Sequence, residues 1–269
     1  MAHPIPTTAS NPSEAFSRLL TVMNTLRIDC PWDRKQTMES LRHLTIEEMY
    51  ELADAILDQD LNEVKKELGD LMMHLVFYAK IAEEQNAFDI TEVLNSVCDK
   101  LIHRHPHIYA DTTVDNDEDV KANWEQIKLN EGNRSVLAGV PKTLPALVKA
   151  YRIQDKVRGV GFDWDDKTEV WKKVEEELQE FKQEFDIEHS DAVDLEKAEQ
   201  EFGDLLFSLI NYARHMGINP ENALEKTNKK FIRRFNHLEQ RASENEQKLS
   251  EMNLAEMDIY WNEAKTLGL

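Results

Sequence analysis

The residues best placed to do chemistry are two matching groups of carboxylates, one in each half of the chain. Each group begins with Glu-Glu-x-x-Glu and is followed, further along, by Glu-x-Gly-Asp. The members are Glu47, Glu48, Glu51, Glu67 and Asp70 in the first half, and Glu176, Glu177, Glu180, Glu201 and Asp204 in the second. Clustered carboxylate oxygens are the ligands that a hard divalent cation such as Mg²⁺ prefers. The repeat therefore predicts a duplicated metal site and points to phosphate chemistry.

Helical spacing predicts that each group converges on one place. Residues three or four apart share a helix face, so two packed antiparallel helices would bring these carboxylates into one cage. The apolar residues around Asp70 and Asp204 predict that both acids are at least partly buried. Burying an unpaired carboxylate costs roughly several kcal/mol, a cost that a bound cation removes. Glu176 is predicted either to ligate the cation or to orient a water molecule.

The type of ligand narrows the choice of metal. A di-iron carboxylate bundle would require Glu-x-x-His, whereas both copies here have Glu-x-x-Asp. Ligation by oxygen alone favours Mg²⁺, with Mn²⁺ as the alternative. A single Glu-Glu-x-x-Glu in so acidic a chain is usually a solvated helix face, and it is the recurrence of the pattern that favours a metal site.

Basic and aromatic residues form a second group of candidates. Lys230 and Arg234 are four residues apart, as are Lys100 and Arg104 at the matching place in the first half. Each pair would lie on one helix face and could bind phosphate oxygens, although pairing with nearby Glu is the alternative. Further candidates are Lys197 for a phosphate and Trp261 for stacking on a base. No Gly-rich Walker loop is present, which disfavours a P-loop NTPase.

Helical periodicity dominates the whole chain. It predicts helices over 13–27 (with Ser13 as N-cap), 37–57, 61–85, 90–105, 120–129, 147–157, 168–185, 192–216, 220–243 and 254–267. The region 131–145 is rich in Gly and Pro and is predicted to be a linker. Landmarks recur in the same order in both halves, including Trp32-Asp33 and Trp164-Asp165. The sequence thus predicts an all-α fold with two tandem homologous domains, 1–135 and 136–269.

Composition limits the partners and the compartment. The formal net charge is −20, which disfavours non-specific binding to nucleic acid or to an anionic membrane. No apolar stretch reaches the length of a membrane span, and the first residues lack the pattern of a signal peptide. The two cysteines, Cys30 and Cys98, suggest neither a disulfide framework nor a zinc motif. We therefore expect a cytoplasmic protein.

The ordered set of motifs resembles the MazG family of all-α nucleoside triphosphate pyrophosphohydrolases, in its two-domain form. The resemblance extends over nearly the whole chain, from about residue 14 to residue 265. Beside the duplicated acidic pattern, it rests on Cys30-Pro31-Trp32-Asp33, Arg104-His105-Pro106-His107, Gly161-Phe162-Asp163-Trp164 and Lys230-Phe231-Ile232-Arg233-Arg234-Phe235. It implies Mg²⁺-dependent hydrolysis of ribo- and deoxynucleoside triphosphates, with broad specificity, to a monophosphate and pyrophosphate. It also implies a homodimer in which helices of two subunits complete a bundle.

The resemblance further implies that the second domain carries the main activity. Asn228-Lys229-Lys230-Phe231 fits the nucleotide-contact helix of the family, whereas Cys98-Asp99-Lys100-Leu101 departs from it. Water would attack the α-phosphorus, and Lys230 and Arg234 would neutralise charge on the leaving pyrophosphate. The implied catalytic residues are Glu176, Glu177, Lys230 and Arg234. The implied substrate-binding residues are Lys197, Asn228, Lys230, Arg234 and Trp261.

Two other interpretations of the sequence remain open. A nucleotide-binding regulator would bind Mg²⁺-nucleotide tightly without releasing pyrophosphate. A helical interaction protein would have solvated acidic faces, and Mg²⁺ would then leave its melting temperature unchanged. If the chain is instead the pyrophosphohydrolase that the resemblance implies, its role would be to clear unwanted nucleotides from the cellular pool.

Overall fold

The computed structural model describes residues 8–114, 116, 120, 123, 124, 127, 135–184 and 194–269. Within these residues the chain forms helices and turns and no strand, which confirms the predicted all-α class. It divides into unit 1, Met1–Thr113, and unit 2, Val114–Leu269. The predicted domain boundary after residue 135 remains a prediction, and most of the predicted helix 120–129 lies outside the described residues.

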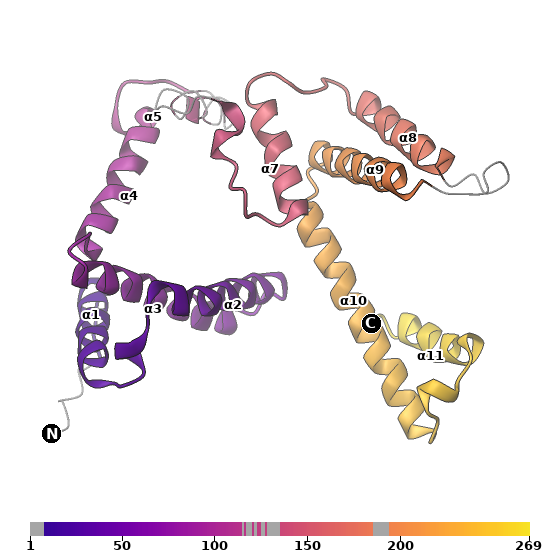
Figure 1. Cartoon of the computed structure of the whole chain (residues 1–269), viewed down its shortest axis with the longest axis horizontal. Coiled ribbons are helices and arrows are strands. Elements are labelled where there is room, and N and C mark those ends of the chain that lie inside the picture. The colour runs from indigo at the N-terminus through magenta and orange to yellow at the C-terminus, as the bar shows by residue number, and fades with distance from the viewer. Residues whose placement is uncertain are drawn as a thin grey trace. The chain divides into compact units, whose positions relative to one another are not determined.

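Unit 1 is built on a pair of helices connected by a short turn. Helix α2 (Met38–Leu57) packs along α3 (Leu61–Glu84), and α1 (Pro12–Asp29) packs on α3 (Figure 1). Helix α4 (Ile90–Arg104) contacts α3 and leads into the single turn of α5 (Pro106–Tyr109). A 3₁₀ turn, Asp33–Lys35, follows α1. The turn between α2 and α3 is so short that the two helices must run antiparallel.

Side-chain caps explain where the helices of unit 1 begin. The Thr37, Asp60 and Asp89 side chains each accept a backbone N–H of the following turn. Helix α1 begins at Pro12 because the Asn11 side chain accepts the N–H of Glu14. The prediction of Ser13 as N-cap was wrong, since proline at the first helical position loses no hydrogen bond and extends the helix backwards.

Unit 2 repeats the paired helices and adds a further pair. Helix α8 (Lys167–Gln183) packs along α9 (Leu195–His215), and α7 (Ala146–Arg158) packs on α9. Helix α10 (Pro220–Glu244) contacts α7 and α9, and α11 (Leu254–Thr266) folds back along it (Figure 1). Two 3₁₀ turns complete the described part, Leu249–Glu251 and Val136–Gly139, of which the second lies within the predicted linker.

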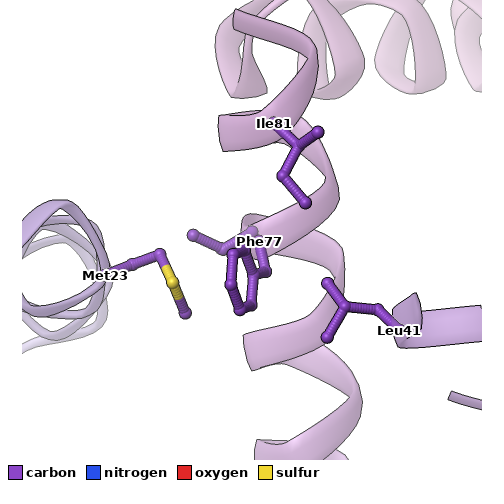
Figure 2. Packing of buried hydrophobic residues seen from close by; sticks show 5 residues of the cluster. Met23, Leu41, Phe77 and Ile81 are labelled. Carbon is purple, nitrogen blue, oxygen red and sulfur yellow. The ribbon is translucent and has the colours of Figure 1, made fainter. Parts of the chain in front are cut away.

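The core of unit 1 lies where three helices meet. Phe77 of α3 lies between Met23 of α1 and Leu41 of α2, and Ile81 extends the cluster by one turn (Figure 2). All four side chains are almost completely buried. Burial of apolar area on this scale is what holds such short helices together.

One matching position in unit 2 is polar. When Gly69-Asp70 is aligned with Gly203-Asp204, Phe77 corresponds to Asn211. Asn211 is buried, and its Oδ1 accepts two hydrogen bonds from the buried Arg214 guanidinium. Gln154 of α7 is also buried, and its Nε2 donates to the Phe207 carbonyl at 2.8 Å. Unit 2 therefore buries hydrogen-bonded polar groups at a place where unit 1 buries an aromatic ring.

An arginine, half-buried in unit 1 and buried in unit 2, anchors the Trp-Asp loop in each unit. In unit 1, Arg27 Nη1 donates to the carbonyls of Asp33 and Gln36, and its Nη2 pairs with Glu84 at 2.9 Å. In unit 2, Arg214 Nη2 pairs with Asp163 at 2.6 Å. These contacts fix the chain just before the helix pair that carries the carboxylates.

No helix among the described residues combines the length and the apolar character that crossing a membrane requires.

Candidate functional site

Unit 1 brings three carboxylates together between α2 and α3. Glu48 of α2 and Glu67 and Asp70 of α3 each have an oxygen within 4.8 Å of the others. Glu67 is only 2% exposed, while Glu48 and Asp70 are half-buried. The antiparallel pairing of the two helices produces this convergence, as the spacing predicts.

The buried carboxylate of unit 1 is only partly satisfied. Lys66 Nζ lies 2.8 Å from Glu67 Oε1, and this hydrogen bond lowers the pKa of Glu67. The other oxygen, Oε2, is buried and has no hydrogen-bond partner among the described residues. Burial raises the pKa of Glu48, and a hydrogen bond with Glu67 and the charges of Asp70 and Glu51 raise it further. The centre thus has more negative charge than its own cations offset.

Unit 2 builds the same centre from α8 and α9. Glu177 and Glu180 of α8 and Glu201 of α9 have oxygens within 4.8 Å of one another. Glu177 is 6% exposed, whereas Glu201 is half-buried and Glu180 is exposed. Desolvation raises the pKa of Glu180, and the neighbouring Glu177 and Glu201 add to that shift.

A lysine of unit 2 contacts two of its acids. Lys173 Nζ lies 2.7 Å from Glu177 and 2.9 Å from Glu176, and these contacts raise the pKa of Lys173. Glu176 is therefore connected to the centre through Lys173 while its side chain remains exposed. Lys173 was not among the predicted residues, although its spacing of three and four from the two acids was visible in the sequence.

The other predicted ligands lie at the borders of these centres. Glu51 is close enough for its charge to raise the pKa of Glu48, and Glu47 is exposed on α2. Asp204 is exposed, so the expectation that it would be at least partly buried was wrong. The neighbouring Leu205 occupies the inward position instead, and Asp204 lies one turn from Glu201 at the edge of the helix pair.

The predicted substrate residues lie mainly on α10 and α11. Arg234 of α10 has its guanidinium 5.9 Å from the Trp261 ring centroid, and its Nε donates to the Leu269 oxygen at 2.6 Å. Phe231 contacts the same tryptophan at 5.0 Å between ring centroids. Lys230 is exposed, and Asn228 donates to Glu225. A guanidinium and an indole side by side can bind a phosphate and a base.

Two predicted cations are not joined to the acidic centre of unit 2. Within the described residues, neither Lys230 nor Arg234 forms an ion pair with Glu177, Glu180 or Glu201. Lys197 is exposed in the first turn of α9. These side chains are available to a ligand, and their roles remain predictions.

A buried histidine that was not among the predicted residues lies on α3, outside the group of converging carboxylates in unit 1. His74 lies one turn after Asp70 on α3 and is 3% exposed. Its Nδ1 has no hydrogen-bond partner among the described residues. Burial lowers the pKa of His74, and the charge of Asp70 opposes that effect. The spacing Asp-x-x-x-His was the available signal.

The donor set of both centres fits a divalent cation. The three converging groups in each are carboxylates, which are the ligands that Mg²⁺ and Mn²⁺ take in proteins. In unit 1 the unpartnered Glu67 Oε2 marks a place where a positive charge would remove a desolvation cost. Glu48, Glu67 and Asp70 would hold the ion in unit 1, and Glu177, Glu180 and Glu201 in unit 2, with Asp204 beside them.

Comparison with known proteins agrees with this arrangement. The family model of the MazG nucleotide pyrophosphohydrolase domain matches twice, at residues 36–109 and 166–239. A nucleoside triphosphate pyrophosphohydrolase of Escherichia coli K12 is 41% identical over 93% of this chain and 97% of its own length. A Thermotoga maritima protein named nucleoside triphosphate pyrophosphohydrolase/pyrophosphatase MazG is 40% identical over 93% of this chain and 95% of its own. An uncharacterised Bacillus subtilis protein, YabN, is 45% identical over 93% of this chain and 51% of its own.

Each matched segment contains one complete acidic centre with the two helices that carry it. The two matches together extend over more than half of the chain, and the relatives cover nearly all of it. The chain belongs to the MazG family of nucleotide pyrophosphohydrolases.

Proposed function

We propose that the chain hydrolyses ribo- and deoxynucleoside triphosphates, with broad specificity, to a nucleoside monophosphate and pyrophosphate. The reaction requires Mg²⁺ or Mn²⁺, and unit 2 carries the main activity. The observation that supports this most is the convergence of Glu177, Glu180 and Glu201 around one point, with Lys173 beside them. The chain is an enzyme, a nucleoside triphosphate pyrophosphohydrolase, as relatives that share nearly its whole length are named.

The metal would be held in unit 2 by Glu177, Glu180, Glu201 and Asp204. When bound, Mg²⁺ would offset the negative charge of the triphosphate and lower the pKa of a water molecule. The raised pKa of Glu180 supports this role, because a cation would favour the ionised form that local desolvation and the neighbouring acids disfavour.

Basic residues of the same unit would bind the phosphates. Lys230 and Arg234 share one face of α10, four residues apart, and Lys230 is exposed. Arg234 lies over Trp261, so a phosphate bound by the guanidinium would have an indole next to it for the base. Lys197 and Asn228 are further contacts on the exposed faces of α9 and α10.

The reaction itself is an attack of water on the α-phosphorus. A new bond forms between the water oxygen and this phosphorus while the bond to the bridging oxygen of the β-phosphate breaks, and pyrophosphate leaves. Glu176 would orient the water or accept its proton, because its carboxylate is exposed and connected to the centre through Lys173. Lys230 and Arg234 would stabilise the charge that develops on the leaving group.

The enzyme would act as a homodimer. Leu68, Met72 and Leu75 form an exposed apolar stripe along α3, and Phe202, Leu206 and Leu209 repeat it along α9. Such stripes at helical spacing usually mark contact surfaces. Helices of a second subunit packed on these faces would also close the acidic centres. The dimer would work in the cytoplasm, clearing unwanted nucleotides, and would bind neither nucleic acid nor membranes.

A panel of canonical and modified triphosphates in H₂¹⁸O with Mg²⁺ tests the proposal. We expect pyrophosphate release from several of them, with ¹⁸O in the monophosphate because water attacks the α-phosphorus. Label in the pyrophosphate would place the attack on the β-phosphorus and contradict the mechanism. Tight binding of Mg²⁺-nucleotide without any release would favour a nucleotide-binding regulator instead.

A further inference from the structure

Arg234 of α10 is held by α11 and the residues that follow it. Its Nε donates to the main-chain oxygen of Leu269 at 2.6 Å, and its guanidinium carbon lies 5.9 Å from the Trp261 ring centroid. A charge-assisted hydrogen bond of this length fixes one edge of the planar guanidinium. Because the ring and the oxygen both belong to α11 and its end, this segment determines where the guanidinium lies.

The Leu269 oxygen is in place because α11 ends in a Schellman motif. The N–H of Gly268 donates to the Lys265 carbonyl at 3.1 Å. The N–H of Leu269 donates to the Ala264 carbonyl at the same distance. Gly268 has a φ of 79°, in the left-handed region that glycine adopts without a steric penalty. Ala264 is completely buried and α11 packs along α10, so the motif is anchored to the helix that carries Arg234.

Two nitrogens of Arg234 remain for a ligand. Within the described part of the chain, Nη1 and Nη2 have no hydrogen-bond acceptor, and the side chain is half-buried. A guanidinium binds phosphate oxygens through two parallel N–H groups, either those of Nη1 and Nη2 or those of Nε and one Nη. Since the Leu269 oxygen occupies Nε, the pair formed by Nη1 and Nη2 is the one that can bind a phosphate.

We propose that Gly268 and Leu269 are positioning residues for the triphosphate. The Leu269 oxygen holds Arg234 against Trp261 and leaves Nη1 and Nη2 for a phosphate, so that the cation and the aromatic ring form one preorganised site. This inference rests on the proposed role of Arg234 in binding the triphosphate. The effect should appear in binding, because a side chain that is already ordered loses less conformational freedom when the phosphate binds.

The same contact could have the opposite effect and inhibit the site. An oxygen that competed with phosphate oxygens for the guanidinium would have to leave before the triphosphate binds. Breaking the contact would then tighten binding, whereas the positioning role requires that breaking it weakens binding. The sign of the change in affinity therefore distinguishes the two roles.

Calorimetric titration with a triphosphate that cannot be hydrolysed tests the proposal without turnover. The probe is a nucleoside triphosphate with a methylene group between the α- and β-phosphorus, added together with Mg²⁺. Gly268→Val puts a β-branched residue in the left-handed region and should displace the Leu269 oxygen. We expect Kd to rise by roughly 3- to 10-fold, the loss of affinity from ordering one long side chain on binding. An unchanged or lower Kd would overturn the proposal.

Gly217→Val is the matched control within unit 2. Gly217 has a φ of 69° in the same motif at the end of α9, where Gly217 donates to Arg214 and Ile218 to Ala213. At both glycines an added Cβ would meet no atom within 4 Å, so the strain comes from the backbone alone. The control should keep Kd within about twofold, and an equal rise in both variants would contradict the positioning role. If Gly268→Val loses helix by circular dichroism, deletion of residues 268 and 269 replaces it, with the same rise expected.

A double variant shows whether the contact acts through Arg234. In a chain with Arg234→Lys, which has no guanidinium at this place, adding Gly268→Val should leave Kd unchanged. A further rise in Kd would mean that the motif acts on the fold and would overturn the proposal. Failure of the proposed reaction would be seen separately, as binding of the triphosphate without pyrophosphate release by the unaltered chain, and the Kd values would still test the contact.

Discussion

The two acidic centres share a plan and differ in their surroundings. Both place three carboxylates between antiparallel helices, and two of the three lie at matching positions of the repeat, whereas the third is Asp70 on the second helix of unit 1 and Glu180 on the first helix of unit 2. In unit 1 the most buried acid is Glu67, on the second helix, and it pairs with Lys66. In unit 2 it is Glu177, on the first helix, and it pairs with Lys173. Neither lysine is repeated in the other unit, so the charges around the two centres differ.

The helix that follows each centre differs as well. In unit 1, α4 has no buried residue, and α5 is a single turn. In unit 2, α10 is longer and packs with α11, which places Arg234 against Trp261. We infer that an acidic centre alone does not make a triphosphate site. We propose that the surrounding cations and aromatic rings determine which of the two centres is catalytic.

The largest expected difference between the two centres is the effect on pyrophosphate release of removing one carboxylate. Asp204→Ala should reduce pyrophosphate release by about 1000-fold, because a ligand of the catalytic ion is removed. Asp70→Ala, the matched change in unit 1, should leave release within a factor of about two. Circular dichroism checks that both variants remain helical. Full activity of Asp204→Ala would remove unit 2 as the catalytic unit.

Removing one interior side chain should lower the free energy of unfolding by different amounts in the two units. Phe77→Ala should destabilise unit 1 by about 3–5 kcal/mol, since a fully buried ring leaves a cavity. Asn211→Ala at the matching place should cost about 1–3 kcal/mol, the effect of leaving Arg214 with fewer partners. Hydrogen exchange of the amides in α1–α3 and in α7–α9 measures the free energy of unfolding of each unit separately. An equal loss in both would show that the interiors are held alike.

Removal of the phosphate-binding cations should have an intermediate effect. Lys230→Ala should lower kcat/KM for triphosphates by roughly 10- to 100-fold, because the charge on the leaving pyrophosphate is less well stabilised. Lys100→Ala should change it little. Steady-state kinetics with one preferred triphosphate compares them. Equal losses would mean that both units contribute to turnover.

The smallest expected effect is the change with pH in the rise in Tm that Mg²⁺ causes. The pKa of Glu48 and of Glu180 is raised, so the metal-free folded state holds these protons more tightly than the unfolded state. Their contribution to stability is present below the ordinary glutamate pKa and is lost as pH rises through the raised values. Because a cation requires the ionised form, the gain in Tm from Mg²⁺ should grow over the same pH range. Thermal melts with and without Mg²⁺ measure it.

Matched variants make the pH prediction decisive. Part of the rise in Tm caused by Mg²⁺ depends on pH. Glu180→Gln should abolish most of the part of this pH dependence that comes from unit 2, and Glu48→Gln should abolish most of the part that comes from unit 1. A gain that is independent of pH in the unaltered chain would show that these carboxylates do not bind the ion.

Most of the fold could be predicted because helical period, caps and breakers agree along the chain. Helices α2 and α3 begin and end within a residue of their predicted bounds. The single turn of α5 was missed because Pro106 was interpreted only as the stop of α4. Proline also suits the first position of a helix, so the chain bends there and resumes helix at once.

The site could be predicted in its ligands better than in its surroundings. Spacing by three and four residues brought Glu48, Glu67 and Asp70 together as expected. The partners of the acids could not be predicted, because they depend on which helix lies deeper in each pair. Lys66, Lys173 and His74 were visible in the sequence, but their environment is set by packing between helices.

The central claim is that unit 2 carries the main pyrophosphohydrolase activity. The most direct measurement is pyrophosphate release by two chains, each with one centre neutralised. We expect the chain with Glu48→Gln, Glu67→Gln and Asp70→Asn to keep its kcat with Mg²⁺. We expect the chain with Glu177→Gln, Glu180→Gln and Glu201→Gln to release no pyrophosphate. Turnover by the second chain, or its loss in a folded first chain, would contradict the assignment.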